Sequence, residues 1–160
     1  MVELPNWEKI VVPQRHGTGC VPTGYEWMLR YLGTKGVNFD TFQEDFDLQY
    51  SGEGKNNFQD VARKVKTTYP DVNISIKSFD IGKEKLEFIA TLVSNAVPCL
   101  LSVAKTPVGG DWHIVPVVSI DDTSVKVIWT GNQTTMFAKT EIIHRHDNWP
   151  GGKDIAWIER

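Results

Sequence analysis

The pattern of apolar residues changes from helical to strand-like after about residue 95, and this order limits the folds open to the chain. Apolar residues recur at helical spacing in four segments, which predicts helices over residues 20–32, 40–48, 58–68 and 83–95. The spacing of apolar residues and turn formers predicts strands over 72–79, 98–104, 113–120, 124–130 and 155–159, with 135–138 as a further piece. Helices first and strands later predict an α+β fold, with N-terminal helices packed on a mostly antiparallel C-terminal sheet.

Local signals support the helix boundaries. Pro22 suits the first turn of the first helix, and Gly33 suits its end. Asp40 is expected to cap the second helix with Gln43 three residues on, and Asn57 to cap the third. The 160 residues contain no repeat or linker, so we expect a single domain over 1–160.

Composition excludes several classes of function. The net charge of −3 and the lack of a basic run argue against nucleic-acid binding. No apolar stretch approaches 18 residues, so we expect no membrane span. The N-terminus has neither the basic region nor the apolar stretch of a secretory signal, which favours the cytoplasm. Oligomeric state cannot be inferred from these features.

Cofactor and metal motifs are also missing. No phosphate-binding glycine motif is present, so we expect no nucleotide cofactor. His144, His146 and Asp147 cluster without a ligand spacing typical of zinc, so we predict an ordinary surface loop there and no metal site. The two cysteines show no disulfide pattern. Cys99 lies in an apolar run, Val97–Val103, and is expected to be an inert core residue.

The other cysteine has the setting of a reactive thiol. Cys20 opens the first predicted helix, where the helix dipole lowers a thiol pKa and favours the thiolate. Gln14 lies six residues upstream and can donate its amide N–H to an oxyanion on a substrate carbonyl. The segment Gln14–Cys20 therefore contains two parts of a site for acyl transfer.

A base for this thiol is expected from His113. A hairpin centred between Asp122 and Thr123 pairs positions that sum to 245, which brings Asn132 opposite His113. Asn132 could then orient the imidazole, although Pro116 could introduce a bulge and shift the register by one residue.

Other candidates for the base and its orienting group are weaker. Asp121 and Asp122 lie more than about 20 Å from His113 along an extended strand and are expected to form the turn instead. His16 is an alternative base in a glycine-rich loop.

Residues beside these candidates are expected to line a substrate groove. Gly19 adjoins the cysteine, and Gly110 gives the backbone freedom to admit a substrate near His113. The large ring of Trp112 or Trp129 could form a wall of the groove, with plain packing as the alternative for either ring.

These motifs together resemble the papain-like cysteine peptidases, and within them the bacteriocin-processing, or double-glycine leader, peptidases and their stand-alone relatives. The resemblance rests on Gln14–Cys20, on the helix that follows through Tyr31-Leu32-Gly33, and on the valine-rich strand opened by His113. It covers about a third of the chain. The sequence departs from the family pattern at Val21, where a small residue is usual, and at Gly131-Asn132, where Asp-Pro is common.

The resemblance implies a papain-like fold and hydrolysis of a peptide or amide bond through a thioester. Cys20 would be the nucleophile, His113 the base and acid, Asn132 the orienting residue, and Gln14 an oxyanion donor beside the Cys20 N–H. The partner would be a peptide or protein substrate. A poised thiolate–imidazolium pair would make Cys20 react with alkylating reagents faster than Cys99 near neutral pH. Two alternatives stay open: a peptide-binding pseudo-peptidase, and an acyltransferase on the same scaffold.

Overall fold

A computed structural model of the chain describes residues 1–15, 19–106 and 109–160. The first part is mostly helical, with strand β1 (Val2–Glu3), a 3-10 turn (Trp7–Lys9) and helices α1 (Cys20–Tyr31), α2 (Phe42–Phe46), α3 (Leu48–Ser51) and α4 (Phe58–Thr68). Strand β2 (Asn73–Ser78) and helix α5 (Gly82–Ser94) follow. The second part contains β3 (Cys99–Thr106), β4 (Gly109–Ile120), β5 (Ser124–Thr130), β6 (Gln133–Ala138), helix α6 (Lys139–Asn148) and β7 (Asp154–Glu159). The predicted order of helices and strands is thus confirmed.

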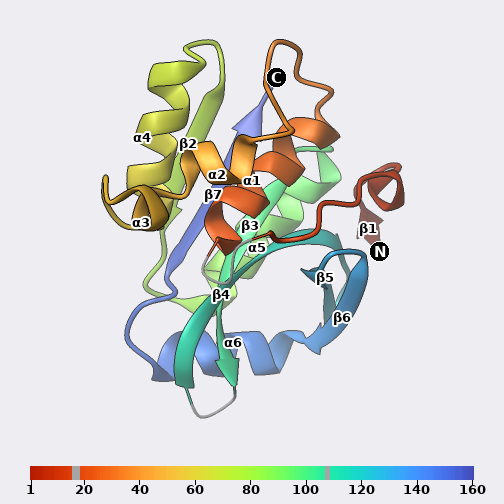
Figure 1. Cartoon of the computed structure of the whole chain (residues 1–160). Helices are drawn as coiled ribbons and strands as arrows, with labels where there is room; N and C mark the ends of the chain where they lie inside the picture. Colours follow the sequence, from red (N-terminus) through yellow and green to blue (C-terminus); the bar gives the residue numbers. More distant parts are fainter. Residues whose placement is uncertain (16–18, 107–108) are drawn as a thin grey trace.

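The strands form one sheet of seven, in the order β2-β7-β3-β4-β5-β6, with β1 paired to β4. Every pairing in it is antiparallel. The last strand of the chain, β7, lies between β2 and β3, so the C-terminal strand is inserted next to the edge strand β2 (Figure 1). The α+β fold with an antiparallel sheet agrees with the expectation from the sequence.

Helices cover the central strands of this sheet. Residues Cys99 to Ala104 of β3 are all buried, which requires cover on both faces of the strand. Figure 1 shows α1 in front of the sheet and α5 behind it. Helix α1 approaches β3 closely at Gly24, where an added Cβ would lie 2.7 Å from Cδ1 of Leu100. This close packing fixes the position of the N-terminus of α1, and therefore of Cys20, relative to the sheet.

The predicted helix boundaries are right in two places and wrong in one. Gly33 follows α1 with φ +66, a conformation that glycine adopts without strain. Asn57 caps α4 by accepting a hydrogen bond from the backbone N–H of Asp60. Asp40 does not cap the second helix: Thr41 precedes Phe42, and the side chain of Gln43 bonds elsewhere.

The segment around His144 is a correction to the sequence analysis. We predicted a surface loop there, and the structure has helix α6 with Arg145 and His146 buried. The Arg145 guanidinium donates to the carbonyl of Ala104 on β3, and its Nε pairs with Glu141 one turn earlier. These polar contacts hold the helix against the sheet. Hydrophobic periodicity does not predict such a helix, because its packing depends on polar side chains.

Across the described ranges, no helix is long and apolar enough to cross a membrane.

Candidate active site

Cys20 is the first residue of α1, as predicted. Gly19 precedes it, and the Gly19 carbonyl accepts hydrogen bonds from both the backbone N–H and the hydroxyl of Thr23. These bonds close the first turn and hold Cys20 at the positive end of the helix. The thiol is partly buried, whereas Cys99 is fully buried in β3, as expected of a core residue.

A small cavity joins the candidate residues from three parts of the chain. Gln14, Cys20 and His113 all line it, with Trp27 of α1 and Trp129 of β5 among its other walls. The cavity is small but large enough to admit a water molecule. Residues nearly a hundred positions apart in the sequence therefore meet at one site, as the sequence analysis expected.

The His113 ring is held by Trp129. Nε2 of His113 lies 2.6 Å from the Trp129 carbonyl oxygen, and the two rings meet edge to face with centroids 4.6 Å apart. A carbonyl oxygen can only accept, so Nε2 carries the hydrogen and donates it. A neutral ring with this tautomer has its lone pair on Nδ1, which makes Nδ1 the proton-accepting atom.

The hairpin register explains why a carbonyl, and not Asn132, is the partner of His113. The predicted sum of 245 holds for Ser119–Lys126 and Ile120–Val125. A bulge then shifts the pairing to Val117–Val127, which sums to 244. The single-residue shift considered for Pro116 thus occurs two residues further on.

Strand β5 ends at Thr130, so Asn132 lies in the turn that follows it and is exposed. It lines an outer groove together with Gln14, Arg15 and Gln133. This groove shares Gln14, Thr130 and Gly131 with the small cavity, so it leads directly into the site.

The electrostatics of the two central groups differ from the expected ion pair. Burial raises the pKa of the Cys20 thiol above its ordinary value, and the N–H of Ile114 and the ammonium of Lys105 oppose the shift without reversing it. Burial lowers the pKa of His113 below its ordinary value, against the opposing effect of the Trp129 carbonyl. Both shifts favour the neutral thiol and the neutral imidazole over the thiolate–imidazolium pair.

Several residues expected around the groove have other roles. The Trp112 ring packs against Gly151 and Gly152, where an added Cβ at Gly152 would lie 2.5 Å from the ring, and Trp112 does not line the cavity. Trp129 does line it, so the wall predicted from one of these two tryptophans is Trp129. Val21 is buried in the core and does not crowd the cavity.

Three further expectations concern glycines and His16. Gly19 directly precedes Cys20, and Gly110 lies three residues before His113 in β4. Their role in substrate binding stays a prediction. His16, the alternative base, lies outside the described residues.

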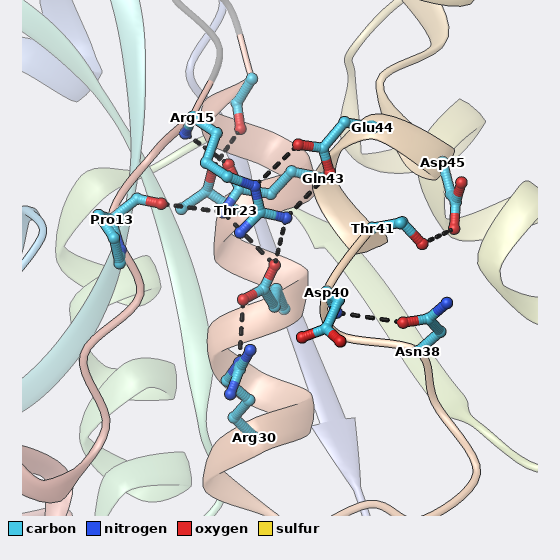
Figure 2. A network of polar contacts seen from close by, with 12 residues as sticks. Pro13, Arg15, Thr23, Arg30, Asn38, Asp40, Thr41, Gln43, Glu44 and Asp45 are labelled. Atoms are coloured by element: carbon cyan, nitrogen blue, oxygen red, sulfur yellow. Dashed lines mark hydrogen bonds and ion pairs between the residues drawn. The ribbon is translucent and has the colours of Figure 1, made fainter.

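The segment that carries Gln14 is tied to α2 by contacts that the sequence did not predict. Figure 2 shows Gln43 between Pro13 and Arg15: its Nε2 donates to the Pro13 carbonyl (3.0 Å), and its Oε1 accepts from the Arg15 N–H (2.7 Å). The Arg15 side chain pairs with Glu44. Gln43 is fully buried, and a glutamine next to Phe42 in a short helix with Glu44 and Asp45 carries no pattern that marks this role.

The fold is that of the C39-type cysteine peptidases, a papain-like class. A C39-like peptidase from Bacillus anthracis superposes with a TM-score of 0.65 at 14% identity, covering 99% of this chain and 98% of that one. A double-glycine motif protease from an AMS/PCAT transporter, solved with its leader peptide, gives a TM-score of 0.58 at 15% identity, with 94% and 91% covered. The peptidase domain of Streptococcus ComA, a bifunctional transporter in quorum sensing, gives 0.57 at 13%, with 94% and 98% covered. No protein-family model and no curated protein matches the sequence.

Proposed function

We propose that this chain is a cysteine peptidase that hydrolyses a peptide bond through a thioester on Cys20. The observation that carries the proposal is the meeting of Gln14, Cys20 and His113 at one cavity within a C39-type fold. A thiol, a base and an amide donor at one point are the minimum set for acyl transfer through sulfur.

The proposed reaction starts from the neutral pair. Nδ1 of His113 takes the thiol proton as the Cys20 sulfur attacks the substrate carbonyl, so the S–C bond forms, the carbonyl π bond opens to an oxyanion, and the ring becomes an imidazolium. The side-chain amide of Gln14 and the backbone N–H of Cys20 stabilise the oxyanion. The imidazolium then protonates the departing amine as the C–N bond breaks, and water hydrolyses the thioester to release the acid and restore the thiol.

We assign the orienting role to the Trp129 carbonyl in place of Asn132. The 2.6 Å contact fixes the tautomer, and the adjoining Trp129 ring restricts rotation of the imidazole. Asn132 is proposed to contact substrate in the outer groove that it lines.

The proposed substrate is a peptide with small residues before the cleaved bond. The cavity at Cys20 is small, with Trp27 and Trp129 among its walls, which favours small side chains at this point. One structural neighbour is a double-glycine motif protease, and peptides with a Gly-Gly pair before the cleavage site are therefore the first to test.

The test is hydrolysis of such peptides, followed by mass spectrometry of the products. We expect the wild type to cleave after the glycine pair, and Cys20→Ala and His113→Ala to lose activity by a factor of roughly 10³ or more. Added hydroxylamine separates hydrolysis from acyl transfer, since an acyltransferase would form the hydroxamate in preference to the acid. Cleavage that survives in Cys20→Ala would contradict the proposal.

One observation favours a second candidate, a peptide-binding protein that does not cleave. The raised pKa of Cys20 leaves little thiolate at neutral pH, and a weakly nucleophilic thiol suits a binding protein. This candidate predicts that the same peptides bind the wild type and Cys20→Ala with equal affinity and stay intact with both.

A further inference from the structure

We infer that Gln43 is a positioning residue that holds Gln14 at the oxyanion site, an inference that rests on the proposed function. Gln14 lies in a segment without regular secondary structure. An oxyanion donor works only when its N–H is held at a fixed place before the oxyanion forms. The segment therefore needs an external support, and Gln43 of α2 provides it.

The contacts of Gln43 fall on the two neighbours of Gln14. Its side-chain amide hydrogen-bonds to the backbone of Pro13 and to the backbone of Arg15. The chain is therefore held one residue before and one residue after Gln14. Figure 2 shows both bonds crossing from α2 to this segment. With both flanks tied to a buried side chain, the Cα of Gln14 has little freedom to move.

A buried carboxylate fixes which way the Gln43 amide points. Oε1 of Glu26 on α1 lies 3.4 Å from Gln43 Nε2, and Glu26 is itself 1% exposed. Arg30 pairs with the other carboxylate oxygen at 2.9 Å, and Arg15 approaches Oε1 at 3.6 Å. A carboxylate only accepts, so the Gln43 NH₂ must face it, and Oε1 of Gln43 is left for the Arg15 N–H.

This arrangement connects the support to the nucleophile. Glu26 lies on α1, the helix that begins at Cys20, so Gln43 ties the Gln14 segment to the same helix that carries the thiol. The positions of the Gln14 donor and the Cys20 sulfur are thus both fixed relative to helix α1. A displacement of about 1 Å in a catalytic group can cost roughly a hundredfold in rate, so holding both groups on one helix matters for catalysis.

The test compares two reactions of Cys20 that differ in their need for an oxyanion donor. An acetylated peptide ending in glycyl-glycinal adds the thiol across its aldehyde: the S–C bond forms, the carbonyl π bond breaks and the thiol proton goes to the oxygen. Its affinity is measured by NMR of a ¹³C-labelled aldehyde carbon, which shifts to the hemithioacetal position. Iodoacetamide displaces iodide at carbon, develops no oxyanion and serves as the second reaction.

We expect Gln43→Leu to weaken aldehyde binding about tenfold or more while the iodoacetamide rate stays within about twofold. Thr41→Ala is the matched control, because it removes a hydrogen bond at the start of the same helix, to Asp45, without touching residues 13–15. It should leave both reactions unchanged. Gln43→Met, which keeps about the same side-chain length and volume and makes neither hydrogen bond, gives a second variant if Gln43→Leu fails to fold.

A double-mutant cycle shows whether Gln43 acts through Gln14. If it does, Gln43→Leu changes aldehyde affinity by less than about twofold once Gln14 is already alanine. Full additivity of the two substitutions would overturn the inference. Unchanged aldehyde affinity in both Gln43 variants, with aldehyde affinity lost in Gln14→Ala, would also overturn it. In either case the proposed function survives. A wild type that forms no hemithioacetal at Cys20 would overturn the proposed function together with the inference.

Discussion

At the scale of single residues, the site depends on a backbone atom as much as on side chains. The Trp129 carbonyl cannot be removed by a side-chain substitution, so the His113 tautomer should tolerate changes elsewhere in the turn. This gives the site a different composition from the Cys-His-Asn triad that the family resemblance implied.

Substitution of Asn132 tests this assignment directly. We expect Asn132→Ala to leave His113 as the Nε2–H tautomer, because its partner is the Trp129 carbonyl. The measurement is ¹⁵N NMR of the ring nitrogens, with Gln133→Ala at the neighbouring first position of β6 as control. A loss of the Nε2–H signal in Asn132→Ala alone would restore Asn132 as the orienting residue.

The sequence allowed Gln14, Cys20 and His113 to be predicted, because their roles follow from residue type, spacing and the start of a helix. The Trp129 carbonyl could not be predicted, because every residue has a carbonyl and no residue type marks this one. The exact position of the bulge, at Val118, could not be located from the sequence pattern. This bulge shifts the pairing register from which Asn132 was predicted to lie opposite His113. Gln43 was expected to take part in capping with Asp40, and its actual contacts could not be predicted because they are to main-chain groups about 30 residues away.

At the scale of elements, the turn before β7 and strand β4 are packed together by Trp112. Gly151 and Gly152 have φ values of +81 and +61, and the Trp112 ring covers both. This contact packs the turn between α6 and β7 against the strand that carries His113.

We expect Gly152→Ala to destabilise the fold by about 2–4 kcal/mol, since it combines a left-handed backbone with a Cβ 2.5 Å from a rigid ring. Gly36→Ala is the control, because Gly36 has φ +80 and open space around it, and its cost should stay near 1 kcal/mol. Urea unfolding followed by fluorescence gives both values. Equal losses in the two variants would contradict the packing described for Trp112.

Helix α6 is an element that hydrophobic periodicity does not predict. Its polar composition predicted a loop, and its position is set by the bond from Arg145 to Ala104 and by burial of His146. Helices α1, α4 and α5 were predictable because their apolar stripes face the sheet and their ends carry ordinary signals, such as Asn57 and Gly33.

At the scale of the whole molecule, the buried basic side chains of Lys85 and His146 lie where α5, α6 and the turn before β7 meet. Lys85 is 1% exposed, donates to the Gly152 carbonyl, and has its pKa lowered by burial to about 7. His146 is also buried, and burial with the charges of Lys85 and Lys153 lowers its pKa to about 4. Asp147 and the Phe79 backbone oppose that shift.

This cluster predicts a loss of stability in acid. His146 binds a proton less readily in the folded chain than in the unfolded one, so its contribution is complete above about pH 6.5 and is lost as the pH falls toward about 4. The free energy of unfolding should therefore fall less steeply over this range in His146→Gln than in the wild type. His144→Gln, at an exposed position of the same helix, should keep the wild-type slope. Equal slopes in all three proteins would refute the coupling.

The overall architecture was predictable because it depends on patterns that extend over many residues. Alternation and apolar runs mark the strands, and the order of helices and strands sets the class. The place of β7 between β2 and β3 was not predictable, since strand order depends on pairings between distant segments. Sequence therefore predicts which elements form, and the long-range contacts decide how they bring the site together.

The central claim is that Cys20 is the reactive thiol of a site completed by His113. Iodoacetamide labelling of the native chain between pH 6 and 10, followed cysteine by cysteine by mass spectrometry, tests it most directly. We predict that Cys20 reacts far ahead of Cys99, whose pKa is raised to about 12 by complete burial, and that the Cys20 rate climbs with pH as thiolate forms. His113→Ala should slow labelling of Cys20 near pH 7. Equal, slow labelling of both cysteines, unaffected by His113→Ala, would contradict the account.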